Sequence, residues 1–211
     1  MAVRQSRTAE DILDIAITYV DEHGLEALTM RSLGEELGWH HTAVYRYYPN
    51  KADLVTAMVD HLLGAAFAAV PIDRVSPRTE LLGIARALRQ LVRDHPAVMQ
   101  AMLHVSGFAP NTVASALRVI DVLEAMGLRD RSLVRWARLL ESYVAGSSLF
   151  DYAGAPEHLT IRRLREHATG SPVLVSTYDD DRAVDEMNEE AFERGLIILI
   201  EAAELEATLS S

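Results

Sequence analysis

The chain has 211 residues, a formal net charge of −11 at pH 7 and no cysteine. The lack of cysteine excludes disulfide bonds and cysteine-based zinc sites. The longest strongly apolar run, residues 196–200, is far too short to cross a membrane, and residues 1–11 lack the apolar stretch of a signal peptide. We therefore expect a cytoplasmic protein without a membrane partner.

The chain can form a sizeable core, because 49% of its residues are hydrophobic. Long runs rich in Leu, Ala, Glu and Arg contain neither Gly nor Pro, and this composition favours an all-α fold. Thr8 and Asp11 stand at the spacing of a capping box, and Gly24 suits a left-handed C-terminal cap. Apolar residues at helical spacing predict helices at about 8–24, 29–38, 41–48, 50–69, 76–92, 96–103, 111–127, 130–154 and 182–205, with a further short helix at 158–167.

Residues 29–51 predict a helix-turn-helix: a short helix, a glycine turn, a second short helix and the capped start of a third. In the second short helix, residues 41–48, Val44 and Tyr48 share the face that can pack on the preceding helices. The opposite face carries Thr42, Tyr45 and Arg46. Arginine can donate two hydrogen bonds to guanine and threonine can contact a thymine methyl group, so this face suits the major groove of DNA. A purely structural helical hairpin is the alternative.

The acidic net charge argues against nucleic-acid binding, but residues 39–51 contain no Asp or Glu. The local potential at this surface can therefore be positive. Phosphate contacts position a protein on DNA without reading its sequence, and Lys51, the only lysine of the chain, stands among helix-start amides suited to such contacts. The residues expected at double-stranded DNA are Thr29, Arg31, His40, His41, Thr42, Ala43, Tyr45, Arg46, Tyr47 and Lys51.

Residues 8–60 resemble the DNA-binding region of the TetR family of transcriptional repressors. The matching residues are LTMR at 28–31, LG at 37–38, AVYRYYPNK at 43–51 and Leu54. In the rest of the chain, FERGL at 192–196 is similar to the final helix of the tetracycline-repressor-like subgroup.

The resemblance implies two domains. Residues 1–51 would form a three-helix DNA-binding domain, and residues 52–211 a larger helical domain that binds a ligand and forms a homodimer. Three residues depart from the family pattern. His40 stands where the family usually has a small polar cap, which predicts weaker capping of the reading helix. Trp39 replaces a smaller aliphatic residue, and Tyr47 replaces a common histidine.

The C-terminal part contains residues that can either line a ligand cavity or belong to an ordinary core. They are Met102, His104, Trp136, Tyr143 and Phe150. In the namesake of the family, imidazoles from the fourth and sixth helices hold tetracycline with magnesium. Phe67 occupies the approximate place of the first imidazole, whereas His104 suits the second. Phe67 is therefore a further cavity candidate, and tetracycline with magnesium is not the ligand we expect.

The predicted last helix is apolar on every side over residues 196–200, so it needs cover on more than one face. The core of the same chain covers one face, and a second subunit can cover the other. The candidate interface residues are Leu140, Phe192, Leu196, Ile197 and Ile200. Such a dimer can hold two recognition helices about 34–36 Å apart, which matches a palindromic operator.

These patterns predict a DNA-binding transcriptional regulator, and the resemblance implies a repressor that a small molecule releases from its operator. In one alternative, the C-terminal domain only dimerises or binds a protein. In another, the chain is an enzyme that has kept a helix-turn-helix; this is disfavoured because the sequence shows no G-x-S-x-G elbow or paired acid and base. His40 and His41 diverge by about 100° around a helix and have no third ligand nearby, so no metal or other cofactor is expected.

Overall fold

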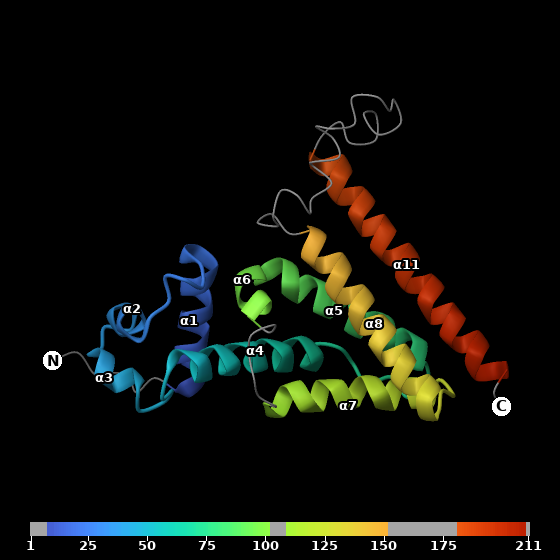
Figure 1. Ribbon diagram of the computed structural model, residues 1–211, viewed down its shortest axis with the longest axis horizontal. Helices are drawn as coiled ribbons and strands as arrows, with labels where there is room; N and C mark the ends of the chain where they lie inside the picture. The colour runs from blue at the N-terminus through green and yellow to red at the C-terminus, as the bar shows by residue number, and fades with distance from the viewer. Residues whose placement is uncertain (1–7, 102–108, 152–180, 210–211) are drawn as a thin grey trace. The chain divides into compact units, whose positions relative to one another are not determined.

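The computed structural model describes residues 8–101, 109–151 and 181–209 (Figure 1). These residues form α-helices joined by turns, and no β-strand occurs among them. The predicted all-α fold is therefore confirmed. The predicted short helix at 158–167 lies outside the described residues. In the described part of the chain, no helix combines the length and apolar character needed to span a membrane.

The chain divides into two compact units, one of Met1–Ala69 with Asp94–Ala116 and one of Val70–Arg93 with Leu117–Ser211. The described helices of the first unit are α1 (Ala9–His23), α2 (Met30–Glu36), α3 (His41–Val44), α4 (Lys51–Ala68), α6 (Pro96–Gln100) and the beginning of α7 (Pro110–Ala125). The second unit holds α5 (Pro77–Asp94) up to its last residue, the remainder of α7, α8 (Asp130–Asp151) and α11 (Asp181–Leu209). The predicted domain boundary after residue 51 stays a prediction.

Helix α1 begins and ends near the predicted residues, but Gly24, with a φ of 83° and a ψ of 157°, does not form the predicted left-handed cap. The amide of Asp11 donates to Thr8 Oγ1 over 3.1 Å, and the amide of Thr8 donates to Asp11 Oδ2 over 2.6 Å. Together these bonds form a capping box. Gly24 follows the helix with a φ of 83°, which lies in the region that favours glycine.

The second short helix is shorter than predicted. It ends at Val44 rather than Tyr48, and residues 45–47 form a turn. The amides of Arg46 and Tyr47 donate to carbonyl oxygens three residues earlier, over 3.3 and 3.0 Å, which is a tighter pattern than that of an α-helix. Pro49 accounts only for Tyr48, which lies outside the helix and the turn, because proline pushes the residue before it out of the helical conformation.

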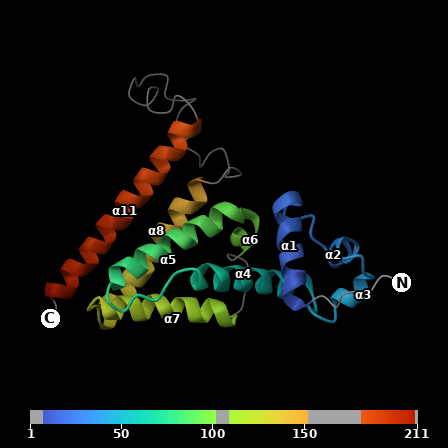
Figure 2. The same ribbon diagram turned by 180° about the vertical axis from the view of Figure 1, so that it is seen from behind.

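Helices α1, α2 and α3 gather at the N-terminal end of the first unit (Figures 1 and 2). A Cβ atom at Gly34 would lie 2.9 Å from the Cα atom of His41, so glycine is what allows the backbones of α2 and α3 to meet. The apolar core of this region includes Ile12, Ala16, Val20, Leu28, Leu33, Val44, Leu54 and Met58.

Two histidine–aspartate contacts join α1 to other helices of the first unit. His61 Nε2 on α4 lies 3.0 Å from Asp14 Oδ1. His95 Nδ1, immediately before α6, lies 2.7 Å from Asp21 Oδ2. The two aspartates are about two helical turns apart and so lie on the same side of α1. The helix that supports the helix-turn-helix is thereby fastened to α4 and α6.

A buried carboxylate organises the beginning of the second unit. Glu80 is 4% exposed and accepts hydrogen bonds from Arg118 Nε and from the amide of Asp73, both over 2.7 Å. Arg118 also donates from Nη2 to the carbonyl oxygen of Val70 over 2.8 Å. These bonds offset the cost of burying the carboxylate. In the same unit, α8 and α11 lie side by side in both views (Figures 1 and 2).

Candidate nucleic-acid interface

The segment 41–48 presents the face that its spacing predicts. Val44 is fully buried and Tyr48 is 9% exposed, whereas Tyr45 is 47% exposed. Thr42 and Arg46 are also exposed. The prediction that the hydroxyl, phenol and guanidinium groups point to solvent is confirmed, because the turn after Val44 keeps Tyr45 and Arg46 on the outer side.

Tyr48 anchors the back of this segment. Its hydroxyl group donates to the carbonyl oxygen of Ala9 over 3.2 Å. Burial raises the pKa of the Tyr48 phenol above its ordinary value, so the hydroxyl remains a donor well above neutral pH. The end of the segment is therefore fastened to the start of α1.

Two residues that depart from the family pattern contact each other. The rings of Trp39 and Tyr47 stack with their centroids 5.8 Å apart and an interplanar angle of 26°, a geometry that adds about 0.5–1.5 kcal/mol to area burial. Trp39 precedes α3 and Tyr47 follows it, so the pair links both ends of the segment. The helical pattern assumed for residues 41–48 could not indicate this pair, because the helix ends at Val44.

The exposed polar side chains of the predicted interface also contact one another. His40 precedes α3 and, among the described residues, makes no side-chain capping bond, so the predicted weaker cap is confirmed. Its Nδ1 lies 2.8 Å from Thr42 Oγ1, and its ring lies 4.3 Å from the ring of His41. On α2, Arg31 Nε donates to Glu35 Oε1 over 3.0 Å.

Two predicted DNA residues have partners inside the protein. Thr29 caps α2, and its Oγ1 accepts a hydrogen bond from the amide of Ser32 over 2.9 Å. Lys51 is half-buried, and its Nζ donates to the carbonyl oxygen of Leu25 over 2.7 Å. An ammonium group has three N–H donors, so this bond leaves donors for a phosphate. No sequence pattern indicates the contact with Leu25, because tertiary folding brings the two residues together.

The predicted cavity residues lie in different parts of the chain. Phe67 is buried in the first unit. In the second unit, the buried Trp136 donates from Nε1 to Glu206 Oε2 over 3.0 Å. The half-buried Tyr143 donates from its hydroxyl to the carbonyl oxygen of Phe192 over 2.9 Å. The cavity stays a prediction, because the described residues exclude Met102, His104 and the side chain of Phe150.

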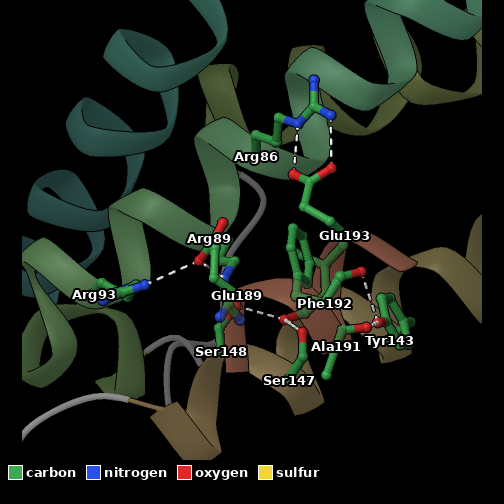
Figure 3. A network of polar contacts seen from close by, with 11 residues as sticks. Arg86, Arg89, Arg93, Tyr143, Ser147, Ser148, Glu189, Ala191, Phe192 and Glu193 are labelled. Carbon is green, nitrogen blue, oxygen red and sulfur yellow. Dashed lines mark hydrogen bonds and ion pairs between the residues drawn. The ribbon is translucent and has the colours of Figure 1, made fainter. Parts of the chain in front are cut away.

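A network of charged side chains joins α5 to α11 in the second unit (Figure 3). Arg86 donates from two nitrogens to the two carboxylate oxygens of Glu193, both over 2.6 Å. Arg89 and Arg93 both donate to Glu189, over 3.2 and 3.1 Å. The hydrogen bonds from Arg86 hold the pKa of Glu193 below its usual value. Sequence reasoning missed this network, because the helical spacing of the three arginines indicates a shared face of α5 but not the partners of that face.

Most of the predicted interface residues are buried within their own chain. They are Leu140, Phe192, Leu196 and Ile200. Ile197 is half-buried. Side chains that their own chain already covers leave little area for a partner subunit. These four residues are therefore a poor choice for the interface, but α8 and α11 remain the candidate helices. The exposed large apolar side chains of these helices are Val134, Leu139, Ile198, Leu205 and Leu209.

Two family matches cover most of the chain in sequence order. Residues 12–58 match the family described as bacterial regulatory proteins, tetR family. Residues 74–206 match the family described as the tetracyclin repressor-like C-terminal domain. The first match contains the helix-turn-helix, and the second contains α5, α6, α7, α8 and most of α11.

Individual relatives agree with these matches. The HTH-type transcriptional repressor DrrR1 of Streptomyces coeruleorubidus is 28% identical over 141 residues; the alignment covers 67% of this chain but about half, 52%, of that protein. The tetracycline repressor protein class A from transposon 1721 of Escherichia coli is 26% identical over 192 residues, which cover 90% of this chain and 87% of that protein.

A solved structure extends the likeness to the fold. The crystal structure of a possible TetR family transcriptional regulator from Streptomyces coelicolor A3(2) has a TM-score of 0.79 and 26% identity, and the match covers 95% of this chain and 100% of that chain. The family matches, the helix-turn-helix and the solvent-facing polar side chains of residues 41–48 agree. The chain belongs to the TetR family of bacterial regulatory proteins and is a DNA-binding transcriptional regulator.

Proposed function

We propose that the chain is a homodimeric repressor that binds a palindromic operator in cytoplasmic DNA and leaves it when a small molecule binds the C-terminal domain. The observation that carries this proposal is the face of segment 41–48, where the hydroxyl, phenol and guanidinium groups stand in solvent above the buried Val44 and Tyr48. We define the reading surface as Arg31, His40, His41, Thr42, Ala43, Tyr45, Arg46 and Tyr47.

Each part of the reading surface has a proposed role. Arg46 reads a guanine through two hydrogen bonds, while Thr42 and Tyr45 contact neighbouring bases. Ala43 is small, which lets the segment approach the floor of the groove. Lys51 and the amides at the start of α4 hold phosphates. The lack of acidic residues between positions 39 and 51 supports this arrangement despite the net charge of −11.

The proposed dimer uses the exposed apolar side chains of α8 and α11. Val134 is 62% exposed, Ile198 is 56% exposed and Leu205 is 61% exposed. Covering apolar surface is favourable by about 25 cal/mol for each Å² removed from water. A two-fold axis makes such an interface self-complementary and presents two reading surfaces to the two halves of a palindrome.

In the proposed mechanism, residues 1–51 bind DNA and residues 52–211 bind the ligand and dimerise. The match to the tetracyclin repressor-like C-terminal domain supports the ligand-binding role, and one relative is itself named a tetracycline repressor. A ligand that favours a dimer with a different spacing of its reading surfaces lowers operator affinity. A hundredfold loss requires about 2.7 kcal/mol of coupling between the two sites.

A second candidate is a regulator whose C-terminal domain only dimerises or binds a protein. The contacts of two cavity candidates favour it: the indole nitrogen of Trp136 bonds to Glu206, and the hydroxyl of Tyr143 bonds to the backbone at Phe192. Polar atoms that already form hydrogen bonds within the protein in this way are not available to bind a ligand. Thermal shift across a library of small molecules separates the two candidates, because only the first predicts stabilisation by a subset of them.

The proposal is tested by selecting duplexes from a random pool with the full-length protein. We expect the selected sequences to contain two inverted half-sites whose centres are about one helical turn, or a multiple of it, apart. Failure to enrich any sequence above the starting pool would contradict sequence-specific binding. Enrichment of a single half-site without its inverted copy would contradict the dimeric arrangement.

A further inference from the structure

Two exposed residues, one just before α3 and one within it, share a hydrogen bond. His40 Nδ1 lies 2.8 Å from Thr42 Oγ1. Thr42 belongs to the solvent face proposed to read bases, whereas His40 stands just before α3 and directs its ring to this hydroxyl rather than capping the helix. Threonine is branched at Cβ and has few side-chain conformations, so a partner on Oγ1 also fixes the direction of its hydroxyl group.

The chemistry of the two groups allows this bond to run in either direction. A neutral imidazole with its proton on Nε2 has a lone pair on Nδ1, and it can only accept from the hydroxyl of Thr42. The threonine oxygen then offers its lone pairs to the outside. A protonated imidazole carries N–H groups on both nitrogens, so Nδ1 donates to Oγ1. The hydroxyl proton of Thr42 is then free to point away from the protein.

We propose that His40 is a specificity-determining residue that sets whether Thr42 presents a hydrogen-bond acceptor or a donor to the DNA bases. This inference rests on the function proposed above. With His40 neutral and its proton on Nε2, Thr42 favours the amino groups of adenine or cytosine in the major groove. The other neutral tautomer donates from Nδ1, as the protonated ring does. With His40 protonated, Thr42 favours the acceptor atoms of guanine or thymine. Histidine is the side chain whose charge ordinarily changes between about pH 5 and pH 8, so the base preference depends on pH.

Helix α2 packs against α3, so the charged and titratable groups that can face His40 stand on its own segment and on α2. On its own segment they are Arg46, the three tyrosines at 45, 47 and 48, and His41, whose ring is 4.3 Å away. Those on α2 are Arg31, Glu35 and Glu36, the first two of which form an ion pair over 3.0 Å. His41 carries the same imidazole group as His40, so a variant of His41 is needed to separate their effects.

The test selects duplexes from a random pool with the full-length protein at about pH 5.5 and about pH 8. For the wild type we expect the preferred base at one position in each half-site to change. It should be adenine or cytosine at high pH and guanine or thymine at low pH. The relative affinity of the two duplexes should shift roughly three- to tenfold, the worth of one net hydrogen bond.

Three variants test which side chain causes this change of base preference with pH. Thr42→Val keeps the shape of the side chain and removes the hydroxyl, so the shift should vanish. His40→Asn places near the position of Nδ1 an amide that does not titrate, so the base preference should be the same at both pH values. His41→Asn removes the neighbouring imidazole and should keep the shift.

Several results would overturn the inference. One is a wild-type base preference that is the same at both pH values, even if lower pH raises affinity for all duplexes equally. Another is a shift that survives in Thr42→Val or in His40→Asn. A failure to enrich any sequence at either pH would overturn the proposed function, and this inference with it.

Discussion

Lys51 bonds to the interior of the protein at the edge of the proposed DNA surface. Its ammonium group donates to the carbonyl oxygen of Leu25, in the connection between α1 and α2, and has two further donors for a phosphate. Arg31 is placed differently, because its partner Glu35 is exposed on the same helix. An exposed ion pair of this kind is worth only about 0.2–1 kcal/mol, so a phosphate can displace Glu35 easily.

At the residue scale, Lys51→Ala should have two separate effects. Loss of the bond to Leu25 should lower the free energy of unfolding by about 1 kcal/mol. Loss of a phosphate contact should weaken binding to all duplexes alike and flatten the slope of log affinity against log salt by about one unit. Urea unfolding and a salt titration of DNA binding measure the two effects. A slope equal to that of the wild type would remove Lys51 from the phosphate contacts.

At the scale of elements, local patterns predicted the helices well and long-range pairings poorly. The capping box at Thr8 depends on neighbours in sequence, so it was readable from the sequence alone. The end of α3 at Val44 was not readable, because Pro49 restricts only Tyr48 and the spacing of Val44 and Tyr48 fits a helix. The pairing of Arg86 with Glu193 was not readable, because it depends on the register in which α5 meets α11.

Helix α2 depends on Gly34 for its approach to α3. Alanine normally stabilises the interior of a helix by up to about 1 kcal/mol over glycine. Gly34→Ala should do the opposite, because its Cβ would lie 2.9 Å from the Cα atom of His41. We expect a lower melting temperature and weaker DNA binding. Gly146→Ala on α8 is the matched control, since its Cβ meets nothing within 4 Å among the described residues; it should raise the melting temperature. A stabilising Gly34→Ala would contradict the close approach.

The contact of Arg86 with Glu193 should make the link between α5 and α11 sensitive to pH. The hydrogen bonds from Arg86 lower the pKa of Glu193 in the folded protein. A carboxylate whose pKa is lowered by folding stabilises the protein at pH values above its ordinary pKa. This stability is lost as the pH falls through the pKa that the group has in the folded protein.

Glu193→Gln should therefore lower the melting temperature at pH 7, and the difference from the wild type should shrink as the pH falls towards about 3. Circular dichroism at a series of pH values measures it. Glu190→Gln, at an exposed position of the same helix, controls for the loss of one negative charge. A difference that stays constant over the whole range would show that Glu193 does not act through its charge.

At the scale of the whole molecule, the two faces of α11 differ in their exposure to solvent. Leu196 and Ile200 are fully buried within the chain, whereas Ile198 is 56% exposed. Sequence reasoning recognised that this helix needs cover on more than one face. It could not tell which residues its own chain covers, because an all-apolar run has no polar side to mark the outside.

Ile198→Glu should therefore split the proposed dimer without unfolding the chain, because it places a charge in the apolar contact. Sedimentation velocity should show a monomer, and circular dichroism should show unchanged helix content. Val75→Glu, at a position that is 96% exposed in the connection between α4 and α5, adds the same charge and should leave the dimer intact. A dimer that survives Ile198→Glu would place the interface elsewhere.

Base reading by the exposed face of residues 41–48 is tested most directly by Arg46→Ala. Gel-shift titration measures the affinity of the wild type and the variant for a selected duplex and for a random one. We expect the variant to lose roughly 5- to 150-fold on the selected duplex, the worth of one bidentate base contact, and much less on the random one. An equal loss on both duplexes would contradict base reading by Arg46 and would leave it only a phosphate contact.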